Sequence, residues 1–91
     1  MAKFLVSHPI GKELTKEAGI PVAKAVKRGC TPDAYWVKGW YARDEGKFYC
    51  EWDAKDAQSV RQVLKTTAPE FPIEGIYEME KDMIFIGEDY R

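Results

Sequence analysis

Few side chains in this sequence suit catalysis or metal binding. His8 is the only histidine, and it stands beside Pro9 at the end of a short β-rich segment, where an imidazole can act as a metal ligand or a general base. A single histidine next to a proline is more often an ordinary surface residue. We therefore keep His8 as the candidate metal ligand and set the surface interpretation beside it.

The two cysteines form no local metal or redox motif. Cys30 and Cys50 are too far apart for a C-x-x-C pair, so neither a zinc knuckle nor a redox dithiol is encoded locally. Cys50 falls on the expected core face, where a free cysteine behaves as a small hydrophobic side chain. Two free thiols in a reducing cytosol is the simpler interpretation, and one long-range disulfide is the alternative.

These residues must be positioned by short strands and two helices. Apolar residues at helical spacing predict a helix over residues 12–28, with a kink or a split at Pro21. A second helix follows, which Asp53 can cap and which ends before Pro69. Runs of β-branched and aromatic residues predict the strands, which cover residues 3–7, 34–42, 47–52 and 75–80.

The order of these elements is strand, helix, hairpin, helix, strand. It is the β-α-β-β-α-β pattern of a ferredoxin-like α+β fold, with an antiparallel sheet and two helices on one face. With 91 residues, the chain has room for one core, so we expect a single domain over residues 1–91.

The central hairpin distributes its side chains over two faces. If residues 43–46 form the loop, residues directly opposite each other on the two strands share a face. The face that looks like core receives the pairs Tyr41/Phe48, Gly39/Cys50 and Val37/Trp52. The other face receives the pairs Trp40/Tyr49 and Lys38/Glu51, with Trp36 at its end. A slip of one residue in this register would exchange the two faces.

The face that carries Trp36, Trp40 and Tyr49 should be the one that the helices leave open. Apolar surface of this kind usually marks an interface or a ligand groove. We predict a homodimer in which two sheets pack face to face, in the manner of a dimeric α+β barrel. The alternative is that these rings pack under residues 83–91 of the same chain. The apolar run at 83–86 is either a fifth strand or a dimer arm.

Composition excludes several classes of partner. The net charge is −1, with basic and acidic residues mixed along the chain, so the chain lacks the basic surface that non-specific nucleic-acid binding needs. No segment approaches the roughly 20 apolar residues that span a bilayer, and the N-terminal apolar run is too short for a signal peptide. We therefore expect a cytoplasmic protein with neither nucleic acid nor membrane as a partner.

The hairpin and its surroundings resemble a family of small ferredoxin-like proteins of mostly unknown function, which includes a nickel-binding, dimeric bacterial protein. The resemblance extends over most of the chain. Its specific part comprises Trp36-Val37, Tyr41, Lys47-Phe48-Tyr49-Cys50, Ala54 and Arg61, with Lys3-Phe4-Leu5-Val6 and Phe71-Pro72 at its two ends. This resemblance implies the ferredoxin-like fold, a dimer and a divalent metal such as nickel.

The sequence departs from that family where a metal would matter most. The family often has histidine where this chain has Lys38 and Val63. Imidazole is a natural ligand for nickel, whereas a charged lysine and a valine are not. The fold and the dimer are therefore implied more strongly than the metal, and His8, Cys50 and Glu51 are the remaining donors.

The leading functional hypothesis is a homodimer that binds a small ligand or a metal ion at the open sheet face. Its ligand-binding residues would be Trp36, Lys38, Trp40, Tyr49 and Glu51. The alternative is a small cofactor-free enzyme of the dimeric α+β-barrel type, similar to an isomerase or a monooxygenase, with His8, Lys38 or Glu51 as acid or base. That alternative needs a cavity of roughly 300 Å³ or more beside one of these three residues.

Two other roles remain open at this stage. An RNA-recognition module shares the strand order, but Glu51 and the acidic balance argue against it. A purely structural or protein-interaction role is compatible with everything in the sequence. For Lys38 and Glu51, the simpler interpretation is a cross-strand ion pair worth about a few tenths of a kcal/mol.

Overall fold

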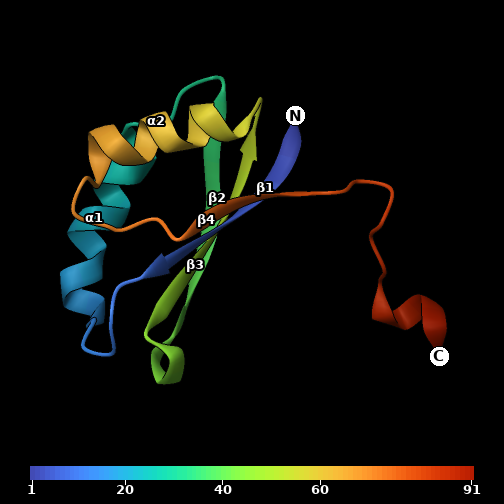
Figure 1. The fold of residues 1–91 in the computed structure, drawn as a ribbon, viewed down its shortest axis with the longest axis horizontal. Coiled ribbons are helices and arrows are strands. Elements are labelled where there is room, and N and C mark those ends of the chain that lie inside the picture. Colours follow the sequence, from blue (N-terminus) through green and yellow to red (C-terminus); the bar gives the residue numbers. More distant parts are fainter.

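The computed structural model describes residues 1–91 and has the predicted ferredoxin-like order (Figure 1). Its helices and strands are β1 (Ala2–Pro9), α1 (Lys16–Arg28), β2 (Ala34–Ala42), β3 (Lys47–Ala54), α2 (Ala57–Thr67) and β4 (Gly75–Met79). The strands form one sheet in the order β2-β3-β1-β4, and every neighbouring pair is antiparallel. The predicted fold class is confirmed.

The core lies between the sheet and the two helices. β1 and β3 contribute alternate side chains, of which Trp52 and Phe4 are the largest that are almost fully buried. The apolar face of α2 meets them from above, as the helical spacing predicts. The remaining members of the buried cluster are Val6, Val26, Ala34, Cys50, Ala54, Val60, Val63, Leu64 and Ala68. The opposite face of the sheet carries no helix (Figure 1).

Helix α1 begins later than the apolar pattern indicates. The side chain of Thr15 accepts a hydrogen bond from the Ala18 amide and caps the helix, so residues 12–15 lie outside it. Pro21 lies inside the helix, which runs from Lys16 to Arg28 as one element. The predicted split at Pro21 is therefore wrong. Pro21 is the sixth residue of the helix, where it removes one backbone hydrogen bond, and the helix continues past it.

Helix α2 is capped by a different aspartate from the one predicted. The carboxylate of Asp56 accepts a hydrogen bond from the Ser59 amide at 2.8 Å. This bond and the one from the Ser59 hydroxyl hold the pKa of Asp56 below its usual value. Asp53 instead lies within β3, where it contacts Lys3. Strand β3 continues two residues further than its sequence pattern indicates, to Ala54. The helix therefore begins later, and Asp56 instead of Asp53 is the residue that precedes it.

The hairpin register is as predicted at its tip and different at its far end. Trp40 lies opposite Tyr49, and Lys38 lies opposite Glu51. A β-bulge at Val37 then places Trp36 opposite Trp52. The extra residue reverses the alternation of the strand. Trp36 therefore packs against the core on the helix side of the sheet, and its predicted place on the open face is wrong.

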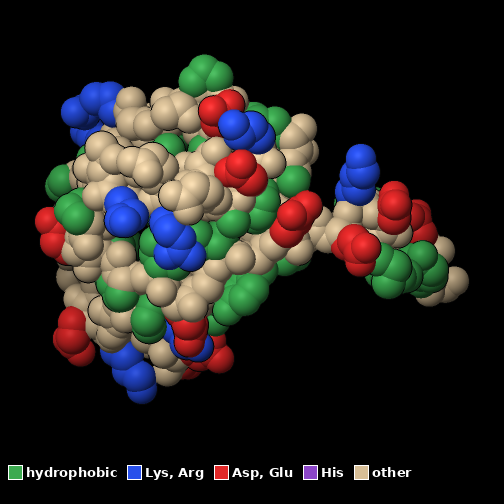
Figure 2. Space-filling view, turned by 45° about the horizontal axis from the view of Figure 1, so that its top comes forward, with side chains coloured by type: hydrophobic (Ala, Val, Ile, Leu, Met, Phe, Trp, Pro, Cys, Tyr) green, Lys and Arg blue, Asp and Glu red, His purple; other side chains and the backbone are tan.

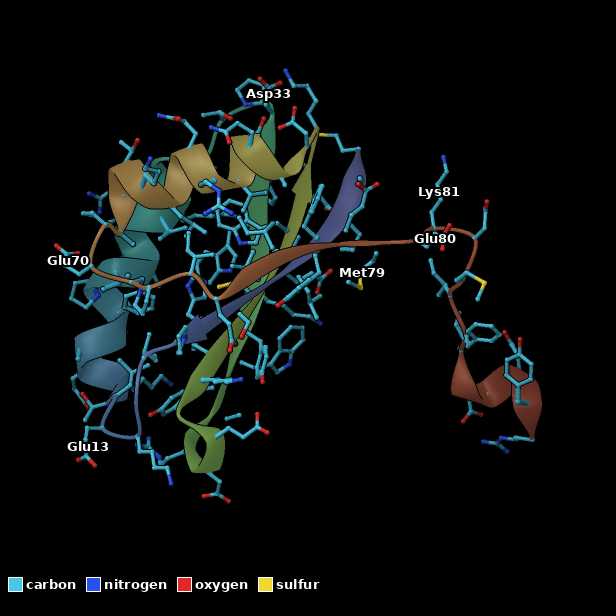
Figure 3. The ribbon with its side chains drawn as sticks, viewed as in Figure 1. Glu13, Asp33, Glu70, Met79, Glu80 and Lys81 are labelled. Atoms are coloured by element: carbon cyan, nitrogen blue, oxygen red, sulfur yellow. The ribbon has the colours of Figure 1, made fainter.

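The C-terminal arm, which we define as residues 80–91, leaves the sheet after β4 and extends away from the domain. Figure 3 shows Met79, Glu80 and Lys81 where the chain departs, and Figure 2 shows the arm as a separate lobe with hydrophobic and acidic side chains. Its exposed apolar residues are Met83, Ile84, Phe85, Ile86 and Tyr90. The arm forms no fifth strand, and it does not cover the aromatic rings of its own sheet.

Neither helix is long and apolar enough to span a membrane.

Candidate functional site

The open face of the sheet brings together four of the five predicted ligand-binding residues, Lys38, Trp40, Tyr49 and Glu51. Trp40 is 47% exposed, and the ammonium of Lys38 lies 5.2 Å from the centre of its ring. Tyr49 stands directly opposite Trp40, and its hydroxyl donates a 2.9 Å hydrogen bond to Glu45. This hydrogen bond raises the pKa of Tyr49. The face thus offers aromatic surface beside one positive charge.

Glu51 does not form the expected ion pair with Lys38. Its carboxylate contacts the ammonium of Lys3 from the neighbouring strand, and Asp53 contacts the same ammonium at 2.7 Å. The hydrogen bonds to Asp53 and Glu51 raise the pKa of Lys3. Lys3 therefore holds both carboxylates, and Lys38 lies over Trp40 instead. The predicted Lys38–Glu51 ion pair is wrong, although the two residues are cross-strand neighbours.

Strand β4 adds apolar surface that the sequence analysis missed. Tyr77 pairs with Leu5 and Met79 pairs with Lys3, and opposed residues share a face. Tyr77 is 52% exposed. The alternation of β4 predicts that Tyr77 and Met79 share a face. Which face that is depends on the pairing of β4 with β1, which the sequence does not show. The open face therefore carries exposed apolar surface at both edges, at Trp40 on β2 and at Tyr77 on β4, with the charged side chains of Lys3, Glu51 and Asp53 on the strands between them.

His8 is fully buried on the helix side of the sheet, so the surface interpretation is wrong. Its Nδ1 lies 2.9 Å from the carbonyl oxygen of Pro72, and its ring packs edge-on against Phe71 with ring centres 5.6 Å apart. Burial lowers the pKa of His8, and the hydrogen bond to Pro72 only partly opposes this. His8 is therefore a neutral core residue at physiological pH.

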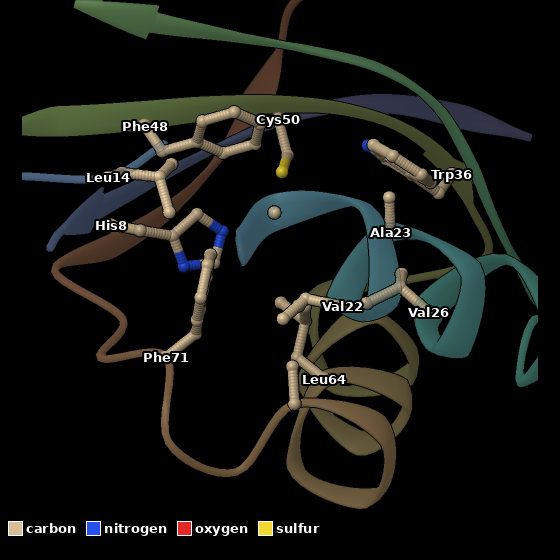
Figure 4. Close-up of a pocket in the computed structure, with 12 residues that line it drawn as sticks. His8, Leu14, Val22, Ala23, Val26, Trp36, Phe48, Cys50, Leu64 and Phe71 are labelled. Atoms are coloured by element: carbon tan, nitrogen blue, oxygen red, sulfur yellow. The ribbon is translucent and has the colours of Figure 1, made fainter. Parts of the chain in front are cut away.

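A small cavity adjoins this imidazole (Figure 4). It has a volume of about 50 Å³, and ten of its twelve lining residues are hydrophobic. Cys50 and Trp36 also line it. Burial raises the pKa of Cys50 to about 12, so the thiol stays protonated. This cavity is far smaller than the roughly 300 Å³ expected of a small-molecule active site.

Residues 4–79 match the family model described as "Nickel responsive protein SCO4226-like". The chain belongs to this family. Among solved structures, the chain is similar to SCO4226 from Streptomyces coelicolor A3(2), with a TM-score of 0.74 and 18% sequence identity over 86% of this chain and 95% of that one. At this identity the likeness shows the ferredoxin-like fold. No match was found among curated proteins.

The residues of this SCO4226-like chain do not fit a nickel ion. No group of three or more histidine, cysteine, aspartate or glutamate side chains could hold a metal. The one imidazole is buried among aromatic rings, and the neighbouring carboxylates of Glu51 and Asp53 are both engaged by Lys3. Nickel prefers imidazole among protein ligands, and this subunit presents none on its surface.

Proposed function

We propose that this protein works as a homodimeric binding protein, which holds a small organic ligand between the open faces of two sheets. The observation that carries the proposal is the open face itself. Trp40 and Tyr77 are each about half exposed there, and no segment of the same chain covers them. Apolar surface of this extent marks an interface or a ligand groove in soluble proteins.

A second copy of the chain is the occupant that this surface favours. Four strands of this length present roughly 500 Å² in plan, whereas a standard interface buries about 800 Å² on each partner. The C-terminal arm supplies the additional apolar area, because its side chains from Met83 to Ile86 are mostly exposed. A twofold dimer presents the same patch twice, so sheet and arm can each meet their counterparts.

The ligand that suits this face is flat, apolar and negatively charged. Trp40 and Tyr49 provide aromatic surface, and Lys38 is the cation beside them. The two carboxylates nearby, Glu51 and Asp53, both contact Lys3. Lys3 and Lys38 together balance their charge, so the repulsion of an anion is reduced. Stacking on an aromatic ring and attraction to an ammonium are both stronger when a second subunit excludes water.

The dimer is tested by measuring the mass of the protein in solution with light scattering. We expect twice the chain mass of 10.4 kDa. Trp40→Glu should give a monomer, because it buries a charge in the interface. Ile20→Glu is the matched control, since Ile20 is 44% exposed on α1, and it should leave the dimer intact. A monomeric wild-type protein would refute the proposal.

The ligand is tested with anilinonaphthalene sulfonate, a flat aromatic anion that fluoresces when it leaves water. We expect the dimer to bind it and Lys38→Ala to weaken binding by about fivefold, which corresponds to about 1 kcal/mol. Lys24→Ala, an exposed lysine on α1, should leave the affinity unchanged. Equal affinities in the two variants would remove Lys38 from the site.

The family description raises nickel as the competing ligand, and calorimetry separates the two. Because the available donors do not form a metal site, we expect no heat of binding when nickel, zinc, copper or cobalt is titrated into the protein. Stoichiometric nickel binding that survives in the His8→Phe variant would show a metal site on the surface, and it would replace the organic ligand in this proposal.

A further inference from the structure

The cavity on the helix side of the sheet contains one unsatisfied polar atom. Nε2 of His8 is fully buried and has no hydrogen-bond partner. In Figure 4 the imidazole reaches into the cavity beside Leu14 and Phe48, with a ring nitrogen directed toward its middle. An unsatisfied buried polar group destabilises the folded protein by about 1–3 kcal/mol. A ligand in the cavity that donated a hydrogen bond to Nε2 would offset this cost.

The tautomer of His8 defines what the cavity can bind. The carbonyl oxygen of Pro72 only accepts hydrogen bonds, so the Nδ1 atom 2.9 Å away carries the proton. Nε2 is consequently a lone-pair acceptor. No charged side chain lines the cavity, and the indole N–H of Trp36 is already bonded to the carbonyl of Lys38. The site therefore requires one donor on an otherwise apolar, uncharged molecule.

Water is a poor match for this cavity. A volume of about 50 Å³ exceeds the 10–15 Å³ or so that one water molecule needs, but a buried water also needs two to four polar partners. Here Nε2 of His8 is the only strong one, and the protonated thiol of Cys50 is a weak one. Apolar cavities of this kind stay dry or take apolar ligands.

A second hollow, open to the surface, lies beside the cavity. A groove of about 420 Å³ lies between the start of α1 and the β2–β3 hairpin, and it shares Leu14, Gly19, Ala23 and Phe48 with the inner cavity. A ligand can therefore place one end at His8 and the rest of its body in the groove. The inner volume accommodates a hydroxyl and a few carbon atoms.

Gly19 lines both hollows. Glycine inside a helix costs about 1 kcal/mol relative to alanine, yet a Cβ atom here would meet nothing within 4 Å. Its φ angle is not one that other residues avoid. Neither packing nor backbone geometry thus requires glycine at this position, and the absence of a side chain leaves free space beside both hollows.

We propose that this protein has a second binding site, in which a neutral apolar alcohol enters past Gly19 and donates its hydroxyl hydrogen to Nε2 of His8. The site lies on the opposite side of the sheet from the dimer face, and it does not depend on the function proposed above. An uncharged head group follows from the absence of charge in the cavity. An elongated body follows from the groove, which is lined by Leu14, Ile20 and Phe48 as well as by Lys16 and Arg43.

Two isomeric probes test this assignment in the full-length protein. n-Hexanol and methyl pentyl ether have the same atoms, but only the alcohol has a donor. We expect n-hexanol to bind about tenfold more tightly, as one buried hydrogen bond implies, and to shift the Nε2 resonance of His8 in a nitrogen NMR spectrum. In His8→Phe the preference for the alcohol should disappear.

Gly19→Leu provides a variant that leaves the core and the imidazole untouched. It should reduce n-hexanol binding at least about tenfold, because its side chain fills the free space beside both hollows, while Trp40→Glu should bind as the wild type does. Equal affinity for the two probes, absence of binding, or an unchanged affinity in Gly19→Leu would each overturn the proposal. So would loss of binding in Trp40→Glu with no change at His8, which would place the alcohol on the open face.

Discussion

At the scale of single residues, burial decides the chemistry more than residue type does. His8 and Cys50 carry an imidazole and a thiol, two groups that often act as a base or a nucleophile in enzymes. Both are neutral here, on the helix side of the sheet. Desolvation lowers the pKa of the imidazole and raises the pKa of the thiol to about 12. Neither group is an exposed acid, base or nucleophile, and the imidazole retains only its capacity to accept a hydrogen bond.

The lowered pKa of His8 makes stability depend on pH. The unfolded chain takes up a proton near pH 6.5, whereas the folded chain does so at a lower pH. Stability is therefore complete above about pH 6.5 and is lost as the pH falls from there toward the folded pKa. Cys50 is the only other titratable group in the cavity lining, and it stays neutral throughout.

We expect urea denaturation of the wild type to show a lower free energy of unfolding at about pH 5.5 than at about pH 7.5. His8→Phe should lose less over the same interval, since it has no imidazole to protonate. The lowered pKa values of Asp56 and Glu74 act at more acidic pH, so they do not obscure the comparison. Identical pH profiles for the two proteins would contradict this account.

At the scale of elements, small local features decide which residues meet. One bulge in β2 moves Trp36 from the open face to the helix side. An extension of β3 by two residues beyond the predicted strand moves the cap of α2 from Asp53 to Asp56. The bulge inserts one residue into β2, and the extension adds two residues to β3. Because side chains alternate between faces along a strand, a shift of one residue is enough to move a side chain to the other face.

The two aspartates make the helix cap testable. Asp56→Ala removes the acceptor for the Ser59 amide and should lower the midpoint of thermal unfolding by several degrees, as the loss of a helix cap does. Asp53→Ala leaves the cap in place and should have a smaller effect, because its contact with Lys3 is half exposed and screened by water. The reverse order would assign the cap to Asp53.

At the scale of the whole molecule, the two faces of one sheet have separate roles. The helix side holds the core and the cavity at His8, and the bare side holds the aromatic surface with Lys38. The family model ends at residue 79, so the C-terminal arm lies outside the matched region. Its exposed apolar side chains are one reason to expect a second subunit.

Removal of residues 80–91 tests the contribution of the arm. Because these residues are exposed and the arm extends away from the core, the shortened protein should keep its circular dichroism spectrum and its thermal midpoint at a concentration where both forms are monomeric. We expect its dimer to dissociate at least about tenfold more readily in analytical ultracentrifugation, owing to the lost apolar contact. An unchanged dissociation constant would confine the interface to the sheet.

Local pattern was sufficient to predict the element order, the fold class and most of the hairpin register. Helical spacing and strand alternation arise from backbone geometry within a few residues, so the order of apolar and polar residues is enough to predict them. The register from Lys38 to Ala42 followed from the length of the turn in the same way. The resemblance in the hairpin also led to the family that the family model confirms.

The environments of particular side chains depended on contacts between distant segments. The bulge at Val37 lets Trp36 pack on a core built by other strands and both helices. The burial of His8 depends on Phe71 and Pro72. These two residues follow α2 and lie more than 60 positions from His8 in the sequence, so local spacing does not reveal the contact. Strand β3 lies between β2 and β1 in the sheet. Glu51 on β3 therefore has lysines on both sides, and it pairs with Lys3 of β1 rather than with Lys38 of β2. Burial and charge pairing belong to the assembled chain, since they are set by neighbours that sequence spacing does not reveal.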